Sequence, residues 1–265
     1  MTFSDTTPND YVNPVPHLGH AYTTGAADVL ARHHRRRGEE VFFLTGTDEN
    51  GTKVATAAGE AGYPGPQEFC DAMSARFREL TAILGSSHDY FIRTTEPDHA
   101  RRVQDLMIKL RDAGQLYEGT YSGLYCTACE LYYAESDLIQ PGNICPVHKR
   151  PVEWFEERNT FFRLSEWGPR LLELYDADAE FVRPRARYNE ARSFIESGLE
   201  DVSFTRQTQT WGIPLPWDET QVVWVWADAL FNYRTGLEYG LGRDVSDTFW
   251  PISLHLLGKD ILRAH

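Results

Sequence analysis

The sequence predicts an α/β fold in which a parallel sheet carries a small β-rich insert. Short apolar runs, suited to strands buried on both faces, alternate with amphipathic helical segments. The middle of the chain is richer in aromatic residues and turns, and it holds three of the four cysteines. A length of 265 residues accommodates one large domain with such an insert.

Composition and charge narrow the class of protein. Apolar residues make up 42% and charged residues 25%, which is ordinary for a globular chain. No apolar run approaches the roughly 18 residues of a membrane helix, and the start, MTFSDTTPND, is too polar for a secretory signal. We therefore expect a cytoplasmic protein that does not bind membranes. The net charge of −13 opposes tight, independent binding to a nucleic-acid backbone.

The first part of the chain predicts alternating strands and helices. Residues 21–37 show the apolar periodicity of a helix, and Gly38 provides its C-terminal stop. Residues 41–47 (VFFLTGT) form an apolar run typical of a strand buried on both faces. A strand before the helix completes a βαβ unit, although that strand, FSDTTPNDYV, is unusually polar. The same patterns predict helices at 66–85 and 97–114 and a strand at 89–94.

The rest of the chain begins with the segment that is rich in aromatic residues and turns. Helical patterning returns around residues 165–198, and residues 221–226 and 252–258 are predicted as buried strands, each followed by a helical pattern. We divide the chain into four parts: the first half of the sheet domain (1–115), the insert (116–157), the remainder of a connective region (158–215) and the start of the second half of the sheet domain (216–265).

Two histidines flank a Leu-Gly pair between the first predicted strand and its helix. In an open α/β sheet, ligands lie at the carboxyl ends of strands, and helix N-termini there favour anions. A glycine lets a base or phosphate approach the backbone, and His17 and His20 can donate hydrogen bonds to phosphoryl oxygens in a transition state. The alternative interpretation is two surface histidines at a helix cap.

A second group of residues predicts a metal site. Cys126, Cys129, Cys145 and His148 follow the spacing Cys-x2-Cys-x15-Cys-x2-His, which suits tetrahedral zinc. Because protein supplies all four ligands, such a site is closed and structural. Cys70 stands apart at a helical position beside Phe69 and Met73, where we expect a buried core thiol.

These motifs together resemble the catalytic region of the methionyl-tRNA synthetases, which are class I aminoacyl-tRNA synthetases. The resemblance runs through almost the whole chain and rests on the cysteine–histidine pairs and on five segments in order: YVNPVPHLGHAYTTGAADVLARHHRRRG, FFLTGTDENG, WGIPLPWDE, VWADALFNY and FWPISLHLLGKDILRAH. It implies a Rossmann-like, doubly wound nucleotide-binding domain, incomplete at its C-terminus and split by a zinc-bearing connective insert. The chain would end before the lysine loop of the KMSKS type.

The resemblance also implies roles for individual residues. His17, Gly19 and His20 match the motif that binds ATP and steadies its α-phosphate, and Gly258 and Asp260 match contacts to adenosine. Asp48 matches the carboxylate that pairs with the amino group of methionine. The walls of the methionine side-chain pocket match Tyr11, Trp226, Ala229, Leu230, Tyr233, Ile261 and His265. Without the resemblance, Asp48 is equally a turn residue, and Trp224, Trp226, Leu230 and Tyr233 are a strand-to-helix core.

The activity implied is that of a methionine–tRNA ligase, which activates methionine with ATP and magnesium and transfers it to tRNA. The acidic chain is not expected to bind tRNA tightly by itself, and a complementing chain is left open. Asn9, Asp10, Asn50, Ala227 and Ala264 depart from the family pattern; histidine is common at position 50. Two alternatives stay open: a truncated, non-catalytic paralogue that binds methionine or ATP, and a zinc-stabilised interaction module.

Overall fold

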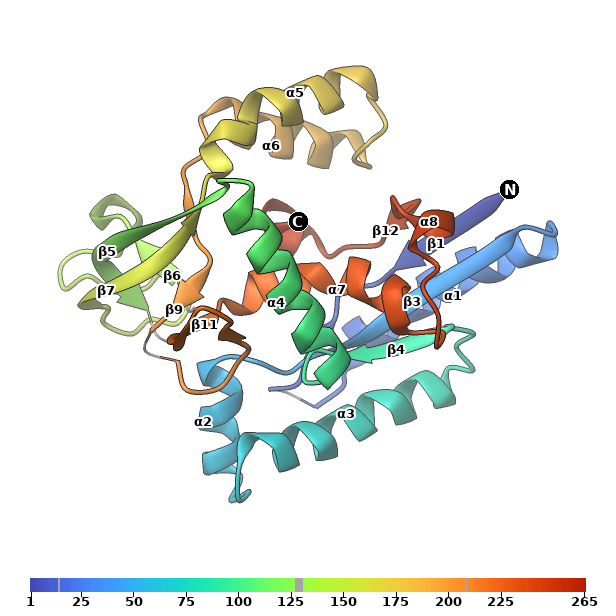
Figure 1. Cartoon of the computed structure of the whole chain (residues 1–265), viewed down its shortest axis with the longest axis horizontal. Coiled ribbons are helices and arrows are strands. Elements are labelled where there is room, and N and C mark those ends of the chain that lie inside the picture. Colours follow the sequence, from blue (N-terminus) through green and yellow to red (C-terminus); the bar gives the residue numbers. More distant parts are fainter. Residues whose placement is uncertain (14, 127–130, 208) are drawn as a thin grey trace.

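The computed structural model describes residues 1–13, 15–126, 131–207 and 209–265 (Figure 1). Its centre is a parallel sheet of five strands: β1 (Thr2–Thr6), β2 (Asp10–Tyr11), β3 (Glu40–Asp48), β4 (Tyr90–Arg93) and β12 (Leu254–His255). Strand β3 pairs with β1 and β2 along one edge and with β4 along the other, and β1 also pairs with β12. Because all four pairings are parallel, the carboxyl ends of these strands meet at one edge of the sheet.

Helices cover both faces of this sheet. Helices α1 (Leu18–Arg36) and α3 (Pro66–Ile83) lie on the face of Phe43, which packs on Ala27 and Ala31 of α1. Helix α7 (Val225–Tyr239) lies on the opposite face against Phe42 and Leu44, with α4 (Pro97–Asp112) beside it. Neighbouring residues of β3 thus face opposite helical layers, which confirms the strand predicted from its apolar run.

The predicted helices of the first part are confirmed, with different ends. Helix α1 begins at Leu18, earlier than predicted, because His17 caps it, and Gly38 follows its end at φ +78°. Helix α4 has Pro97 in its first turn, and Gly114 follows it at φ +72°. Helix α2 (Thr52–Glu60), rich in alanine and threonine, was not predicted; it packs against α3.

Three expectations about strands and helices need correction. The polar segment FSDTTPNDYV is not one strand but β1 and β2, interrupted at Pro8, which has no N–H for a ladder. The strand predicted at 221–226 is β11 (Asp218–Val223), and Trp224 caps α7, so Val225 and Trp226 are helical. Strand β11 lies outside the parallel sheet, in an antiparallel sheet with β9 (Thr205–Arg206) and β10 (Pro214–Leu215). The helical pattern after β12 forms a 3-10 helix, η3 (Lys259–Ala264).

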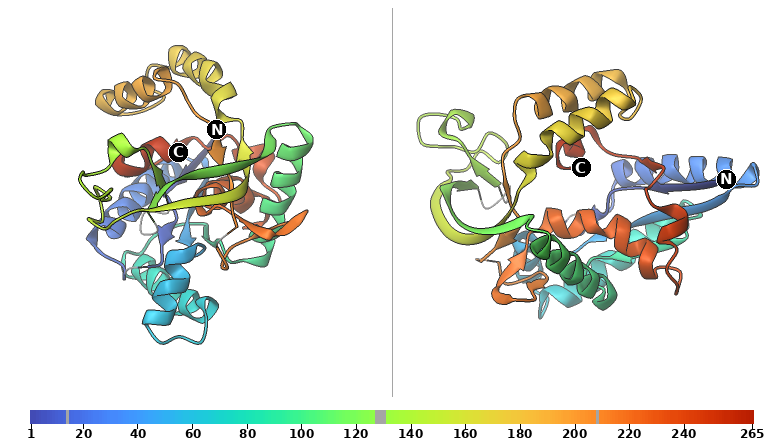
Figure 2. Two further views of the ribbon diagram at one scale, coloured as in Figure 1. Left: turned by 90° about the vertical axis from the view of Figure 1, so that its left-hand side faces the viewer. Right: turned by 45° about the horizontal axis from the view of Figure 1, so that its top comes forward.

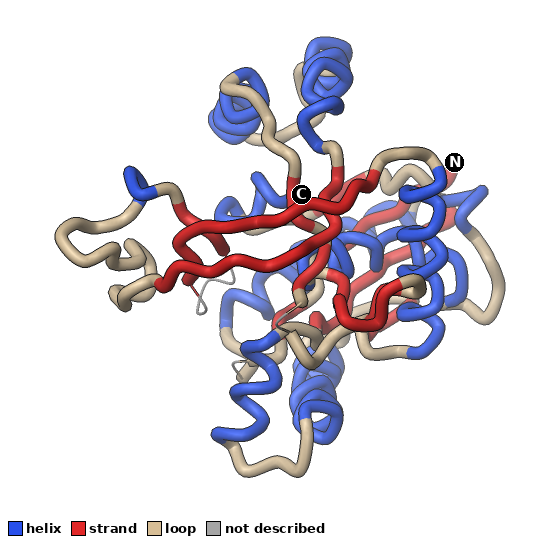
Figure 3. The backbone as a smooth tube through the Cα atoms, turned by 60° about the vertical axis from the view of Figure 1, so that its left-hand side comes forward, coloured by secondary structure: helices blue, strands red, loops and turns tan. Residues whose placement is uncertain are grey.

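A second antiparallel sheet forms the middle of the chain (Figure 3). It consists of β5 (Leu116–Cys126), β6 (Leu131–Tyr133), β7 (Glu153–Phe162) and β8 (Val202–Ser203), in the order β6-β5-β7-β8. Helices α5 (Gly168–Ala177) and α6 (Arg185–Glu196) pair with each other beyond one end of this sheet (Figure 2). The β-rich segment and the helical patterning around 165–198 are therefore both confirmed. Short elements complete the fold: η1 (Glu135–Asp137), η2 (Leu164–Trp167) and α8 (Ser246–Phe249).

No helix among the described residues is long and apolar enough to cross a membrane. Cys70 is fully buried beside Phe69 and Met73, and its Sγ lies 3.4 Å from the carbonyl oxygen of Glu49. Burial raises the pKa of this thiol. The expectation of a buried core thiol is confirmed.

The polar first strand buries a carboxyl group. Asp5, between β3 and β12, is 0% exposed, and neither of its carboxyl oxygens has a hydrogen-bond partner among the described residues. Burial raises the pKa of Asp5 to about 7, although Arg35 opposes the shift. The folded chain therefore holds a proton on Asp5 that the unfolded chain releases above its ordinary pKa of 3.8.

Asp5→Asn should remove a pH dependence of stability. Because the folded-state pKa is raised, the stability present below pH 4 is lost as the pH rises to about 7. The free energy of unfolding of Asp5→Asn minus that of wild type should therefore be larger at pH 8 than at pH 5. The increase should be about 2–3 kcal/mol, at roughly 1.4 kcal/mol per pKa unit. Urea unfolding at both pH values measures it, with exposed Asp105→Asn as control. Parallel pH profiles of wild type and Asp5→Asn would contradict this account.

Candidate functional site

A cavity of about 340 Å³ lies where β2 and β3 end against helix α7 and η3. All eight residues that the resemblance assigned to methionine line this one cavity: Tyr11, Asp48, Trp226, Ala229, Leu230, Tyr233, Ile261 and His265. The lining is completed by Pro8, Asn9, Lys53, Val225 and Asn232, none of which was expected. Segments from both ends of the chain thus form one pocket of a size that suits a small organic ligand.

One end of the cavity is polar and is built by the end of β3. Asp48 is the last residue of β3 and is 9% exposed; the Thr94 hydroxyl lies 3.5 Å from its Oδ1. The Tyr11 hydroxyl donates to the backbone oxygen of Asn50 at 3.1 Å. This end therefore offers a carboxylate beside an ordered tyrosine, which suits a cationic group of a ligand.

The other end is apolar and is built mainly by α7. Trp226, Ala229, Leu230 and Tyr233 follow the spacing i, i+3, i+4, i+7, which places them on one face of the helix. His265 stands 2.8 Å from the Tyr233 hydroxyl through Nε2, and its Nδ1 lies 3.0 Å from the carbonyl oxygen of Ile261. Since a carbonyl only accepts, Nδ1 carries the proton of the neutral ring and Nε2 accepts from Tyr233.

The two groups at this end are uncharged near neutral pH. Burial lowers the pKa of His265 and raises the pKa of Tyr233. The hydroxyl proton of Tyr233 is used by His265, so the wall presents aromatic faces and an oxygen lone pair to the cavity. Such a wall suits an uncharged, polarisable side chain.

The histidine pair stands at the N-terminus of α1. The backbone N–H of Gly19 donates to His17 Nδ1 at 3.0 Å, the backbone N–H of His17 donates to His20 Nδ1 at 3.2 Å, and the two rings stack at 3.8 Å. In their neutral forms both rings therefore carry the proton on Nε2. A Cβ on Gly19 would lie 2.8 Å from His17 Cε1, so a larger residue here would push the His17 ring out of its capping position. The cap interpretation is correct for His17, and the same geometry leaves two Nε2–H donors at a helix N-terminus.

Asp10 lies next to this pair, and its place there was not expected. Its Oδ1 is 3.9 Å from His20 Nε2. Burial raises the pKa of Asp10 to about 7, whereas burial and His17 lower the pKa of His20 to about 4. Between pH 4 and 7 the contact thus joins two uncharged groups and is not an ion pair. The signal for Asp10 was its charge within an otherwise buried strand segment.

Gly258 and Asp260 lie beyond the cavity. Gly258 caps η3 three residues after the end of β12, the strand beside β1, and Asp260 lies exposed in the first turn of η3. Neither residue lines the cavity. The structure places both at the sheet edge that carries the histidine pair.

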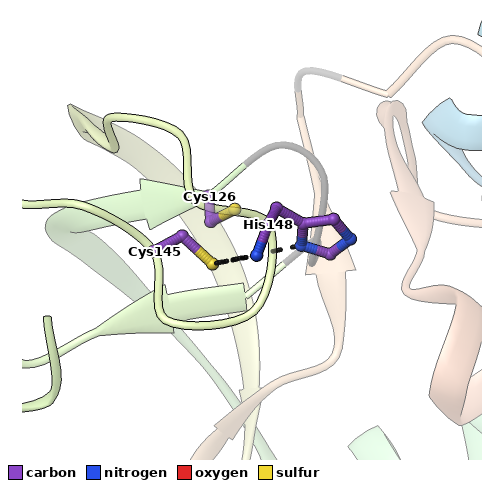
Figure 4. A group of neighbouring side chains, drawn as sticks. All are labelled: Cys126, Cys145 and His148. Atoms are coloured by element: carbon purple, nitrogen blue, oxygen red, sulfur yellow. Dashed lines mark hydrogen bonds between the residues drawn. The ribbon is translucent and has the colours of Figure 1, made fainter. Parts of the chain in front are cut away.

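A candidate metal centre lies in the β-rich segment (Figure 4). The ligand atoms of Cys126, Cys145 and His148 all lie within 4.8 Å of one another, and Cys145 Sγ is 4.0 Å from His148 Nδ1. Ligands around tetrahedral zinc stand about 3.8 Å apart, given a Zn–S bond of about 2.3 Å. The backbone N–H of His148 also points at Cys145 Sγ, at 3.4 Å. Two thiols and an imidazole at this spacing fit zinc; Cys129 lies outside the described residues.

Comparisons with known proteins agree with this geometry. A sequence model described as "tRNA synthetases class I (M)" matches residues 5–150 and 135–265. A methionine–tRNA ligase from Thermotoga maritima is 47% identical over all of this chain and 42% of its own length. The chain belongs to the methionyl-tRNA synthetase family. Another methionine–tRNA ligase, from Streptomyces coelicolor, is 45% identical over 98% of the chain and 49% of its own length.

Solved structures of the methionyl-tRNA synthetase family share the fold. The Mycobacterium tuberculosis methionyl-tRNA synthetase in complex with methionyl-adenylate matches with a TM-score of 0.93 and 39% identity, over 100% of this chain and 53% of that one. The apo form of that synthetase matches with a TM-score of 0.81. The α/β fold of a class I synthetase catalytic domain is thus established. The chain spans about half the length of the curated relatives it matches.

Sequence reasoning missed several residues of the cavity of this methionyl-tRNA synthetase family member. Lys53 and Asn9 line the cavity. Lys53 lies in helix α2, which was not predicted, and Asn9 lies in the polar segment predicted as the first strand, whose pattern does not show which residues face a cavity. Asn232 could have been predicted from the sequence, because it directly precedes Tyr233 on α7. Asp228, fully buried behind the cavity wall, was indicated only as a charge on an otherwise apolar helix face.

Proposed function

We propose that this chain is the amino-acid-activating part of a methionine–tRNA ligase, which forms methionyl-adenylate from methionine and ATP. One observation carries the proposal: eight residues expected from the family motifs line a single cavity, with Tyr11 and Asp48 contributed by the paired strands β2 and β3 and the aromatic and apolar residues mainly by helix α7. The carboxylate of Asp48 pairs with the ammonium group of methionine. The thioether lies among Trp226, Leu230 and Tyr233, because sulfur is polarisable and packs well on aromatic rings.

ATP binds along the same edge of the sheet. The Nε2–H groups of His17 and His20 donate to phosphate oxygens, Gly19 allows the nucleotide to approach, and Gly258 and Asp260 contact the adenosine. The carboxylate of methionine attacks the α-phosphorus, a new P–O bond forms, and pyrophosphate leaves with the electron pair of the bond that breaks. Histidine donors at the α-phosphate stabilise the charge that develops on its oxygens. Magnesium bound with ATP supplies further charge neutralisation.

The whole protein would then transfer the methionyl group to the 3′ end of tRNA. The chain carries a net charge of −13, so contacts to the tRNA backbone are expected outside the acidic surface of these residues. We assign residues 1–115 and 216–265 to the catalytic domain, 116–157 to the zinc-bearing insert, and 158–215 to the rest of the connective region. The antiparallel ladder between β5 and β7 is continuous from Leu116–Phe162 to Tyr125–Glu153, so strand β7 itself crosses the boundary proposed at residue 157.

Cys126, Cys129, Cys145 and His148 would hold one structural zinc ion. The small apolar cluster around Cys126 and Cys145, with Leu138 and Val152, is too small to stabilise this segment alone. Zinc binding would supply the missing free energy of folding.

Methionine-dependent exchange of pyrophosphate into ATP tests the proposed activity. We expect exchange in the wild-type protein and a loss of about 100-fold in His20→Ala, because one donor to a developing oxyanion contributes about that factor. His33→Ala, in the exposed last turn of the same helix, is the matched control and should retain exchange. Methionine binding without exchange would instead support the non-catalytic paralogue, and binding of neither ligand the interaction module.

Metal analysis tests the proposed zinc site. The purified protein should hold one zinc ion per chain, and His148→Gln should lose most of it, whereas exposed His33→Gln should not. Chelation should lower the melting temperature of wild type more than that of His148→Gln. A metal-free wild-type protein whose melting temperature does not change with added zinc would contradict the assignment.

A further inference from the structure

A chain of buried hydrogen bonds joins the end of β3 to helices α7 and α4. The side-chain amide of Asn50 donates to Asp228 Oδ2 at 2.6 Å, and Asp228 Oδ1 accepts from His99 Nε2 at 2.7 Å. His99 Nδ1 lies 2.7 Å from the hydroxyl of Thr235, two helical turns farther along α7. Asn50 is 4% exposed, and Asp228, His99 and Thr235 are 0% exposed. A carboxylate so deeply buried depends on both of its donors.

This chain connects the two ends of the amino-acid cavity. The polar end belongs to β3 and its continuation, through Asp48 and through the Asn50 backbone oxygen that holds Tyr11. The apolar end belongs to α7, where Asp228 directly precedes Ala229 of the cavity wall. The bond between Asn50 and Asp228 therefore ties the element that carries the carboxylate to the helix that carries the wall.

We propose that Asn50, Asp228 and His99 are positioning residues that set the distance between the ammonium-binding carboxylate and the apolar wall, and with it the length of amino-acid side chain accepted. The inference rests on the proposed function, because this distance limits the side chain only of an amino acid that is bound both at the carboxylate and at the apolar wall. None of the three residues lines the cavity, so each acts through a neighbour. Asp228 fixes the first turn of α7, and His99 fixes Asp228 from α4.

The hydrogen bonds of the three residues are suited to fixing the position of helix α7 relative to strand β3. Two hydrogen bonds from opposite sides hold the Asp228 carboxylate in one orientation, so α7 cannot slide along the sheet without leaving a buried oxygen unpaired. A pocket of fixed length can distinguish side chains that differ by one methylene by about tenfold or more. Loosening the tie should therefore weaken the discrimination between methionine and its longer analogue ethionine more than it alters the chemistry at the α-phosphate.

A reciprocal exchange of side chains tests the proposal. Asn50→Asp brings two carboxylates together, and Asp228→Asn leaves one oxygen for two donors, Asn50 Nδ2 and His99 Nε2, so each single variant disrupts the pairing of Asn50 with residue 228. In the double variant, the new amide at position 228 can donate to the new carboxylate at position 50 and still accept from His99. Net charge in the double variant equals that of wild type, which makes it the matched control for both singles.

Dissociation constants for L-methionine and L-ethionine are measured by calorimetry, with thermal unfolding in parallel. We expect each single variant to raise the dissociation constant for methionine about tenfold. The ratio of the ethionine constant to the methionine constant should fall at least threefold; a lost methylene contact changes such a ratio by about tenfold. The double variant should restore that ratio to within about twofold of wild type. Should a single variant unfold the chain, Asn50→Ala, which adds no charge, gives the same comparison.

The outcomes separate the two proposals. Lower melting temperatures with an unchanged ratio in the single variants would show a merely structural role and overturn the inference, as would a folded double variant that fails to restore the ratio. A wild-type protein that binds neither amino acid would instead overturn the proposed function.

Discussion

Parallel pairing of β3 on both of its edges is the constraint on which the rest of the site depends. The strand is held by β1 and β2 on one side and by β4 on the other, so its last residue, Asp48, is fixed at the rim of the sheet. The approach of β4 is close: a Cβ on Gly46 would lie 2.0 Å from the carbonyl oxygen of Ile92. Glycine at this position therefore permits the spacing that brings the cavity together.

The carboxyl groups along β1 and β2 lower the stability of this sheet when they are ionised. Both Asp5 and Asp10 have pKa values raised to about 7 by burial, so near neutral pH part of the population carries each as an uncharged acid. At Asp10, the uncharged fraction adds no negative charge beside His20 at the N-terminus of helix α1. At Asp5 it lowers stability, since no described partner satisfies the carboxyl oxygens.

Much of the fold and of the candidate site followed from the sequence, for identifiable reasons. Strand β3 and helices α1, α3 and α4 have strong apolar periodicity with glycine or proline at their ends, and local patterns of this kind predict elements well. The strand at 221–226 was misplaced because a run of valine and tryptophan fits a strand and a buried helix equally. The links from Asn50 to Asp228 and from Asp10 to His20 could not be predicted, since they join residues whose proximity is set by tertiary packing.

The pairing of Asp48 with the ammonium group of methionine is the central claim, and calorimetry with an analogue lacking that group tests it most directly. Wild type and Asp48→Asn are each titrated with L-methionine and with 4-(methylthio)butanoate, which keeps the thioether and the carboxylate. We expect wild type to prefer methionine by at least about tenfold, as for a buried charge-assisted contact, and Asp48→Asn to bind the two ligands equally. An unchanged preference for methionine in folded Asp48→Asn would contradict the account.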